Sequence, residues 1–207
     1  MKTRTLKQSD MAAKAAGEIL KNGGIVAFPT DTVYGLGAVY TDTEAVAEIF
    51  RAKGRDEGKP LSILISDAKD VRLLSDNIPE RAWKLFGAFW PGALTVIVEK
   101  NDSVPGVVAA GGSTVGIRMP ASDIARKIIK EAGSPLAAPS ANTSGKRSAV
   151  TAEEVSEDLD GKIDMIVDGG ACPVGLSSTV VDITGEEIRI LRTGSISRAD
   201  IEEALGK

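Results

Sequence analysis

Short apolar runs alternate along this chain with longer segments rich in helix-forming residues, and the alternation restricts the fold more than any other feature. The first apolar run, residues 25–28, follows a helix-like segment at residues 10–22 that a Gly-Gly pair ends. A capping-box pattern from Thr41 to Glu44 predicts a second helix that ends near Lys53. Such alternation is typical of α/β proteins, in which helices pack on a sheet.

The same patterns continue to the end of the chain. Strands are predicted at residues 61–65, 93–98, 115–118, 136–138, 165–168, 179–183 and 188–191, and helices at 80–89, at 122–132, after Thr151 and from Ser197. The last strands follow one another without helices between them, so we expect a mixed sheet. No linker, repeat or low-complexity segment divides the sequence, which predicts a single domain over residues 1–207.

Composition excludes several classes of function. The sequence has no histidine, which rules out imidazole acid–base chemistry, the Ser-His-Asp triad and histidine-ligated zinc. Its single cysteine, Cys172, cannot form an intrachain disulfide and is expected to be inert. No apolar run approaches the length of a membrane helix, and no signal-peptide pattern is seen, so we expect a cytoplasmic location. The net charge of -4 argues against a protein that mainly wraps nucleic acid.

Small polar and cationic residues gather in segments that adjoin the apolar runs. These segments are residues 29–37, 53–55, 111–118, 139–142, 177–179 and 192–194. Loops at strand ends are where α/β proteins place ligands, and guanidinium, ammonium and hydroxyl groups suit an anion. Carboxylates are nearly absent from these segments, with Asp31 the exception, which disfavours hydrolases built on paired acids. The segments therefore predict an anion-binding site.

Each segment also has an ordinary structural explanation. Residues 53–55 could be cations at the carboxyl end of a helix, and residues 29–37 could be a simple turn. Ser140 and Asn142 could be turn or cap residues, and Thr179 a hydroxyl within the sheet. Neither G-x-G-x-x-G nor a Walker lysine motif is present to indicate a nucleotide.

Longer stretches of the sequence carry more specific motifs. They are GGIVAFPTDTVYGLGA (residues 23–38), IFRAKGR (49–55) with KPL (59–61), FWPGALTVIV (89–98), TVGIRMP (114–120), PLAAPSANTSGKRS (135–148), SSTVVD (177–182) and LRTGSIS (191–197). In this order and over most of the chain, they resemble the YrdC-like family of threonylcarbamoyl-AMP synthases. Only the amino-terminal helix, the middle helices and the tail lie outside them.

The resemblance implies a fold and a reaction. The fold is a YrdC-like α/β domain with helices around a twisted mixed sheet, largely antiparallel with parallel parts, and a positively charged central cavity. In the reaction, the amine of L-threonine captures carbon dioxide or bicarbonate, and the resulting carbamate attacks the α-phosphate of ATP. Pyrophosphate leaves, and the product, threonylcarbamoyl-AMP, supplies a threonylcarbamoyl transfer complex that modifies tRNA. A weak contact with tRNA or double-stranded RNA belongs to the same expectation, and a membrane partner does not.

The resemblance also implies roles for individual residues. Those expected in catalysis form the KxR…SxN tetrad, which is Lys53, Arg55, Ser140 and Asn142. Those expected to bind ATP are Arg55, Lys59, Thr114, Ser140, Asn142, Ser148 and Arg192. Those expected to bind threonine are Thr32, Tyr34, Arg118, Ala138 and Thr179, with Arg118 gripping the carboxylate. Magnesium (Mg2+) is expected as a cofactor that the ATP phosphates and water hold, without dedicated protein ligands.

The sequence departs from the family pattern at two positions. Many relatives carry histidine where this chain has Leu64, and some carry asparagine where it has Lys59. The chain also ends soon after residues 191–197, which predicts a minimal, single-domain form.

Three other functions stay open at this point. The first is an RNA-binding module, which the net charge and the aromatic content of 4% weaken. The second is a paralogue that handles a carbamoyl-adenylate, as a YrdC-like domain does within a larger hydrogenase-maturation protein; the zinc-finger cysteines expected there are absent. The third is a paralogue of the same fold that has changed its choice of amino acid.

Overall fold

The computed structural model describes residues 2–206, and the predicted helices and strands are all present with ends within one residue of prediction. The elements in chain order are β1 (Arg4–Lys7), α1 (Asp10–Lys21), β2 (Val26–Phe28), β3 (Gly35–Val39), α2 (Thr43–Lys53), β4 (Ser62–Leu64), the 3₁₀ helix η1 (Ala68–Leu73), α3 (Glu80–Phe89), β5 (Leu94–Glu99), β6 (Thr114–Arg118), α4 (Asp123–Ala132), β7 (Leu136–Ala137), α5 (Ala152–Leu159), β8 (Met165–Asp168), β9 (Thr179–Asp182), β10 (Arg189–Arg192) and α6 (Arg198–Ala204). None of these helices is long and apolar enough to cross a bilayer.

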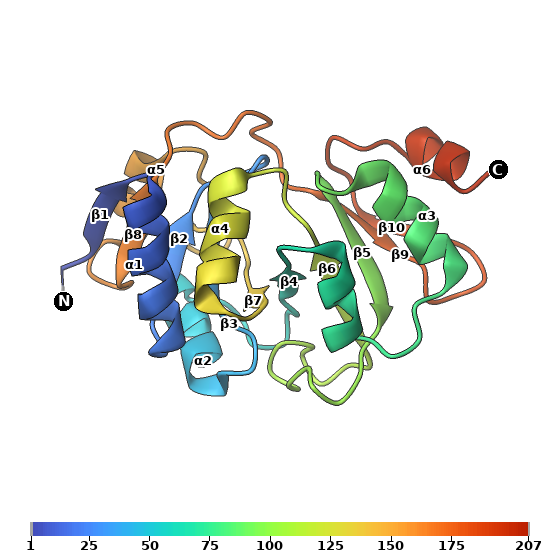
Figure 1. Ribbon diagram of the computed structural model, residues 1–207, viewed down its shortest axis with the longest axis horizontal. Coiled ribbons are helices and arrows are strands. Elements are labelled where there is room, and N and C mark those ends of the chain that lie inside the picture. The colour runs from blue at the N-terminus through green and yellow to red at the C-terminus, as the bar shows by residue number, and fades with distance from the viewer. Residues whose placement is uncertain (1, 207) are drawn as a thin grey trace.

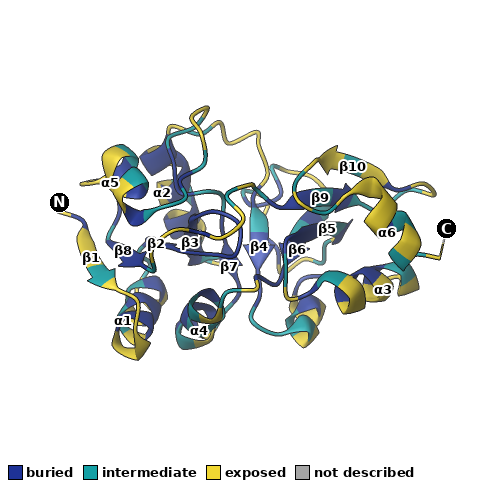
Figure 2. Ribbon diagram, turned by 90° about the horizontal axis from the view of Figure 1, so that it is seen from above, coloured by how far each residue is buried: buried dark blue, intermediate teal, exposed yellow. Residues whose placement is uncertain are grey.

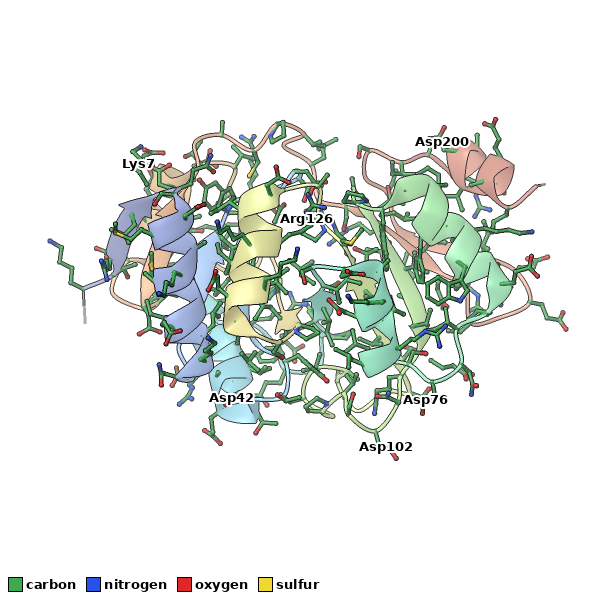
Figure 3. All side chains as sticks on the ribbon, in the orientation of Figure 1. Lys7, Asp42, Asp76, Asp102, Arg126 and Asp200 are labelled. Atoms are coloured by element: carbon green, nitrogen blue, oxygen red, sulfur yellow. The ribbon has the colours of Figure 1, made fainter. Side chains whose placement is uncertain are left out.

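Side-chain caps explain where most helices begin. Ser9 caps α1. Asp42, and not Thr41 as the capping-box pattern predicted, caps α2 by accepting a hydrogen bond from the backbone N–H of Ala45 at 3.0 Å. At α6 the cap is reciprocal, because Asp200 also accepts from the backbone N–H of Ser197. Asp42 and Asp200 lie at the periphery of the molecule (Figure 3). Each cap satisfies an N–H group that a helix start leaves without an internal partner.

The strands form one ten-stranded sheet in the order β1-β8-β2-β3-β7-β4-β6-β5-β9-β10, with the two chain ends at opposite ends of the molecule (Figure 1). Among the described residues, five neighbouring pairs are antiparallel and four are parallel. The predicted mixed sheet in a single α/β domain is confirmed. The antiparallel pairs are only a slight majority, because β1, β2, β4 and β5 each have a parallel neighbour.

Helices bury both faces of the sheet at its amino-terminal end. Helices α1 and α4 pack on the face that carries Phe28, Leu136 and Met165, while α2 and α5 lie on the other side of the same strands (Figure 2). In Figure 2 the central strands are buried, whereas β10 and the outer faces of α5 and α6 are exposed.

At the other end of the sheet the two faces differ. Helix α3 and η1 bury the face of β4, β6 and β5 that carries Ile63 and Ile117. On the opposite face of β6, Thr114 and Gly116 are only half-buried. Because side chains alternate along β6, one face of the strand is covered and the opposite face stays partly open.

Strand β3 corrects the expectation that residues 29–37 are a loop throughout. Gly35 and Gly37 look like turn residues in the sequence, yet they pair with Phe28 and Val26 of β2. A Cβ on Gly37 would lie 2.8 Å from Cε1 of Phe28, so glycine is needed to let the ring pack against the strand. Strand β1, which the sequence did not reveal, joins the sheet by parallel pairing with β8.

The contact between α1 and α4 gives a test of the packing. A Cβ on Gly17 of α1 would lie 2.5 Å from the Cβ of Glu131 and 2.7 Å from its carbonyl carbon. We expect Gly17→Ala to lower the free energy of unfolding by about 1–3 kcal/mol, because the two helices must move apart. Gly87 of α3 is the matched control, since nothing lies within 4 Å of its Cβ position. There alanine should stabilise the helix by roughly 0.5–1 kcal/mol. Urea unfolding measures the free energy of unfolding of both variants. Equal changes in Gly17→Ala and Gly87→Ala would contradict the close packing of α1 on α4.

Candidate functional site

A pocket of about 660 Å³, counting the space open to solvent, lies on the partly open face of β4, β6 and β5. Its polar lining consists of the side chains of Thr30, Thr32, Ser62, Thr95, Ser140, Ser177 and Ser178 and the guanidinium groups of Arg55, Arg118 and Arg192. None of the described residues that line it is acidic. The composition of the lining indicates an anionic ligand.

Backbone pairing brings distant motifs to this pocket. The N–H of Ala141 donates to the carbonyl of Tyr34 at 2.8 Å, and the N–H of Leu36 donates to that of Pro139 at 2.9 Å. On the other side, Leu64 of β4 pairs with Arg118 of β6. Segments around residues 34, 64, 118 and 140 therefore share one site, as the sequence predicted.

Arg118 lies beneath the pocket in a fixed orientation. Its Nε donates to the carbonyl of Gly92 at 2.9 Å. Its Nη1 donates to Oγ1 of Thr32 at 2.8 Å, and its Nη2 to Oδ1 of Asp31 at 2.6 Å. A guanidinium has five N–H groups, so one on each Nη stays available for a ligand. Burial lowers the pKa of Arg118, while the carboxylate of Asp31 opposes the shift. The predicted carboxylate grip has the donors it requires.

The hydroxyl of Thr32 faces the pocket as an acceptor. The hydroxyl of Thr30 donates to the carbonyl of Val33 at 2.7 Å and has no second hydrogen to give. Oγ1 of Thr32 lies 3.0 Å from Oγ1 of Thr30, so Thr32 must be the donor of that bond. Because Thr32 also accepts from Arg118, it keeps one lone pair for a ligand N–H group. The amine of a ligand bound beside Arg118 would donate a hydrogen bond to Oγ1 of Thr32.

Lys53 corrects one prediction, because it does not line the pocket. The side chain is 2% exposed, and its Nζ donates to the carbonyls of Ser140 and Asn142. Burial lowers the pKa of Lys53 to about 8, with a further contribution from the nearby charge of Arg55. The structure thus uses this lysine to hold the 140–142 loop, whereas the resemblance implied a role in catalysis.

Two buried polar atoms near the pocket have no hydrogen-bond partner among the described residues: Nε of Arg55 and Oδ1 of Asn142. Arg55 lines the pocket, and its Nη2 donates to the carbonyl of Pro60 at 3.1 Å. Asn142 lies outside the lining, and its amide nitrogen donates to the carbonyls of Thr143 and Lys146. Buried polar groups are rarely left unpaired, so the free Nε of Arg55 points to a ligand acceptor.

Arg192 reaches the pocket from the last strand of the sheet. Its Nε donates to the carbonyl of Ser178 at 2.9 Å and its Nη2 to Oγ of the same residue at 2.9 Å. Oγ of Ser178 is in turn 2.8 Å from Oγ1 of Thr95. The pKa of Arg192 is lowered mainly by burial, then by the charges of Arg118 and Arg55. The positive charges of these three arginines repel one another, and a bound anion would offset that repulsion.

Thr179 is a second correction. Its hydroxyl donates to the carbonyl of Ile196 at 2.7 Å and accepts from the N–H groups of Gly194 and Ile196. Side chains alternate along a strand, so Thr179 points away from the pocket that Ser178 lines. Thr179 therefore holds the 194–196 turn and does not face the pocket, in contrast to the contact with threonine that the resemblance implied.

The other predicted residues divide between the pocket and its surroundings. Tyr34, Ala138 and Ser140 line it, although the hydroxyl of Tyr34 is used in bonds to Gly169 and Gly170. Lys59, Thr114 and Ser148 do not line it; Thr114 lies on the face of β6 that carries Arg118, and Ser148 Oγ is 3.4 Å from that of Ser177. Cys172 is buried, and burial raises the pKa of its thiol to about 11.

Five hydroxyl residues of the lining were given no role from the sequence: Thr30, Ser62, Thr95, Ser177 and Ser178. Ser178 stands within the SSTVVD stretch, next to Thr179, which the resemblance implied would bind threonine. Thr95 is a single hydroxyl in the apolar stretch FWPGALTVIV, and that isolated polar residue was the available signal.

Comparison with known proteins gives a consistent result. Residues 18–194 match the Sua5_yciO_yrdC family model, described as "Telomere recombination". The chain is 45% identical over 94% of its length to the threonylcarbamoyl-AMP synthase of Pyrococcus abyssi, and 45% identical over 99% to that of Bacillus subtilis. It spans 57% and 59% of the length of those two relatives. A putative threonylcarbamoyl-AMP synthase of Mycobacterium tuberculosis is 36% identical, and the match covers 96% of that protein.

Solved structures agree with the fold. The crystal structure of P. abyssi Sua5 complexed with L-threonine superposes with a TM-score of 0.95 at 42% identity, covering 100% of this chain and 61% of the other. That of E. coli YciO superposes with a TM-score of 0.85 at 24% identity, covering 93% of this chain and 96% of the other.

The buried charge of Lys53 predicts a dependence of stability on pH. Its pKa in the folded protein, about 8, is below the ordinary value of 10.5. Between these values the unfolded chain binds more protons, so the free energy of unfolding rises with pH. We expect the wild type to gain about 2 kcal/mol relative to Lys53→Met between about pH 7.5 and 9.5, measured by urea unfolding. Lys14→Met, at an exposed position of α1, is the control and should show no such difference. A parallel pH response of Lys53→Met and wild type would disprove the assignment.

Proposed function

The chain belongs to the Sua5/YciO/YrdC family, and we propose that it forms threonylcarbamoyl-AMP from L-threonine, carbon dioxide or bicarbonate, and ATP. The observation that carries the proposal is a single pocket with three arginines, several hydroxyls and no acidic lining residue among those described. Such a lining can hold a carboxylate and a chain of phosphates together. The named relatives support the reaction, and this chain corresponds to about three fifths of the two most identical among them.

The chemistry joins two anions. The amine of threonine adds to the carbon of carbon dioxide and loses a proton, which gives a carbamate. A carbamate oxygen then attacks the α-phosphorus of ATP, and the bond from that phosphorus to the bridging oxygen breaks. Pyrophosphate leaves with the electron pair. Because the nucleophile and the leaving group are both anionic, positioning and charge neutralisation are the main tasks, and no histidine is needed.

Arg118 and Thr32 are suited to hold the amino acid. The two N–H groups left on Arg118 would donate to the threonine carboxylate, and the lone pair left on Thr32 would accept from its amine. Asp31 neutralises part of the charge of Arg118 and keeps the guanidinium from turning. The amino acid would therefore bind in one orientation, with its amine directed into the pocket.

Arg55 and Ser140 are suited to hold the phosphates. The Nε of Arg55 has no partner among the described residues, and Ser140 stands beside it on the loop that Lys53 holds. Residues 2–206 contain no group of three or more acidic or thiol side chains that could bind a metal ion. The proposal includes a magnesium ion held by phosphate and water oxygens, where it would neutralise phosphate charge. In the cell, the proposal places the protein in the cytoplasm, as supplier of a threonylcarbamoyl transfer complex that modifies tRNA.

A product assay tests the proposal. The protein is incubated with ATP, magnesium, bicarbonate and labelled threonine, and pyrophosphate and the adenylate are followed by chromatography. We expect threonine-dependent pyrophosphate release and a threonylcarbamoyl-AMP peak, with little release when another amino acid replaces threonine. Absence of both products, together with tight binding of tRNA or duplex RNA at physiological salt, would favour the RNA-binding alternative instead.

Two substitutions should separate the ends of the pocket. Arg55→Ala should reduce turnover about tenfold or more through weaker handling of ATP, whereas Thr32→Ala should raise the KM for threonine more than that for ATP. Arg126→Ala is the control for Arg55→Ala, because Arg126 pairs with Asp123 on the outside of α4 (Figure 3). Steady-state kinetics with each substrate varied provides the measurement. Equal losses for both substrates in Thr32→Ala, or full activity of Arg55→Ala, would refute these roles.

A further inference from the structure

Residues 140–146 carry Ser140 and Asn142 on irregular backbone outside the named strands. Among the described residues, a single bridge between Ser140 and Gly35 gives this segment strand-like pairing. Irregular backbone keeps one geometry only where other groups satisfy its N–H and C=O groups. The position of Ser140 and Asn142 therefore depends on the groups that bond this segment.

Lys53, at the end of α2, is the first of these groups. Its Nζ donates to the carbonyls of Ser140 and Asn142, and its own carbonyl accepts from the N–H of Ser144 at 2.8 Å. These bonds do not use the N–H of Thr143, which is bonded by a different helix. The segment is thus held from two helices.

Asp158 of α5 is the second group. Its Oδ2 accepts from the backbone N–H of Thr143 at 2.9 Å, and its Oδ1 accepts from Nζ of Lys146. The side chain of Asp158 is 10% exposed, whereas that of Lys146 is 62% exposed. The hydrogen bonds from Lys146 and Thr143 lower the pKa of Asp158, so the group is a carboxylate at neutral pH. One nearly buried carboxylate thus binds two points of the 143–146 turn.

The 143–146 turn sets the orientation of Asn142. The amide nitrogen of Asn142 donates to the carbonyls of Thr143 at 2.8 Å and Lys146 at 3.0 Å. The N–H of Lys146 donates to the carbonyl of Thr143 at 3.1 Å, and Gly145 provides the left-handed residue within the turn, at φ 87°. Because the nitrogen of Asn142 is bonded to the turn, a displacement of the turn would also displace this side chain.

Helix α5 gives the carboxylate a fixed support. Val155 and Leu159 of this helix are completely buried in the core. At its carboxyl end, Nζ of Lys162 donates to the carbonyl of Asp158 at 2.9 Å. The preceding acidic residue, Glu157, is exposed. Two adjacent carboxylates of one helix therefore differ, since Asp158 bonds the turn while Glu157 lies in solvent.

We propose that Asp158 is a positioning residue of the reaction, which holds the 143–146 turn on α5 and thereby sets the places of Ser140 and Asn142. This inference rests on the proposed function, and it gives Asp158 no contact with substrate. Ser140 lines the pocket beside Arg55, at the end suited to phosphates. Loss of the carboxylate would leave the segment held by Lys53 alone, and would weaken the handling of ATP.

The other end of the pocket does not depend on this segment. Arg118 is held by the carbonyl of Gly92, by Thr32 and by Asp31, none of which belongs to residues 140–146. The binding of threonine should therefore be preserved when the turn is released from α5.

The test compares Asp158→Ala, which removes both acceptor oxygens, with Asp158→Asn, which keeps one for the N–H of Thr143. Pyrophosphate release is measured with ATP and threonine each varied. We expect Asp158→Ala to raise the KM for ATP about tenfold, because small displacements of positioning groups are costly, and to change that for threonine less than about twofold. Asp158→Asn should stay within about threefold of wild type for both substrates.

Three control variants accompany the test. Glu157→Ala removes the adjacent carboxylate of the same helix. Lys146→Met removes only the exposed partner of Asp158, and exposed ion pairs contribute little. Gly17→Ala is expected to lower stability at the contact between α1 and α4. All three should keep the KM for ATP within about twofold of wild type, since surface changes and distant packing leave the turn in place.

Hydrogen exchange gives a second measurement that needs no substrate. The amides of residues 141–146 should exchange faster in Asp158→Ala than in wild type or Glu157→Ala, because the N–H of Thr143 loses its acceptor. Unchanged exchange in this segment would overturn the inference.

The kinetic outcomes separate the two proposals. If the wild type is active but Asp158→Ala keeps the wild-type KM for ATP, this inference is wrong and the proposed function stands. An equal rise in Gly17→Ala, or an equal rise for threonine in Asp158→Ala, would assign the effect to lost stability and would also overturn it. A wild-type protein without threonine-dependent pyrophosphate release would overturn both proposals.

Discussion

Three guanidinium groups face one pocket, and the repulsion among them is the constraint that the surrounding structure must satisfy. Asp31 supplies a compensating carboxylate to Arg118, and the charge of Asp56 opposes the lowering of the pKa of Arg55 by burial. The other two are held by neutral acceptors: Arg192 by Ser178, and Arg55 by the carbonyl of Pro60. In a partly buried site such repulsion is weakly screened, so the cations stay together only because a rigid sheet and its loops fix them. An anionic ligand would remove this strain, which links the fold directly to binding.

Several polar residues next to the pocket support its shape without facing a ligand. Lys53 donates to two carbonyls of the 140–142 loop, Thr179 bonds the 194–196 turn, and the hydroxyl of Tyr34 joins residues 169 and 170. Each spends its hydrogen-bonding groups on backbone atoms of these loops. These contacts explain how loops far apart in the chain keep a common geometry. They also separate residues that position the site from those that can touch substrate.

The secondary structure was largely predictable, and the exceptions have physical causes. Helix caps, glycine stops and apolar runs are local features, so the predicted elements agree with the structure almost to the residue. Strand β3 escaped prediction because Gly35 and Gly37 serve close packing against Phe28, and a glycine gives no local sign of that use. The strand order escaped it too, because β7 lies between β3 and β4 through contacts that no single segment encodes.

By itself, the sequence determined the α/β class, the absence of histidine chemistry, the cationic and hydroxylic character of the site, and the family resemblance carried by its motifs. These follow from residue types and short spacings, which are properties of the chain before it folds. Only the tertiary structure decided which of those polar groups face the pocket. It turned Ser178 toward the pocket and Thr179 away from it, buried Lys53 beneath a loop, and placed Thr95 between Arg118 and Arg192. Strand alternation and register across β6, β5, β9 and β10 set those directions, and they depend on partners that lie up to 85 residues away in the sequence.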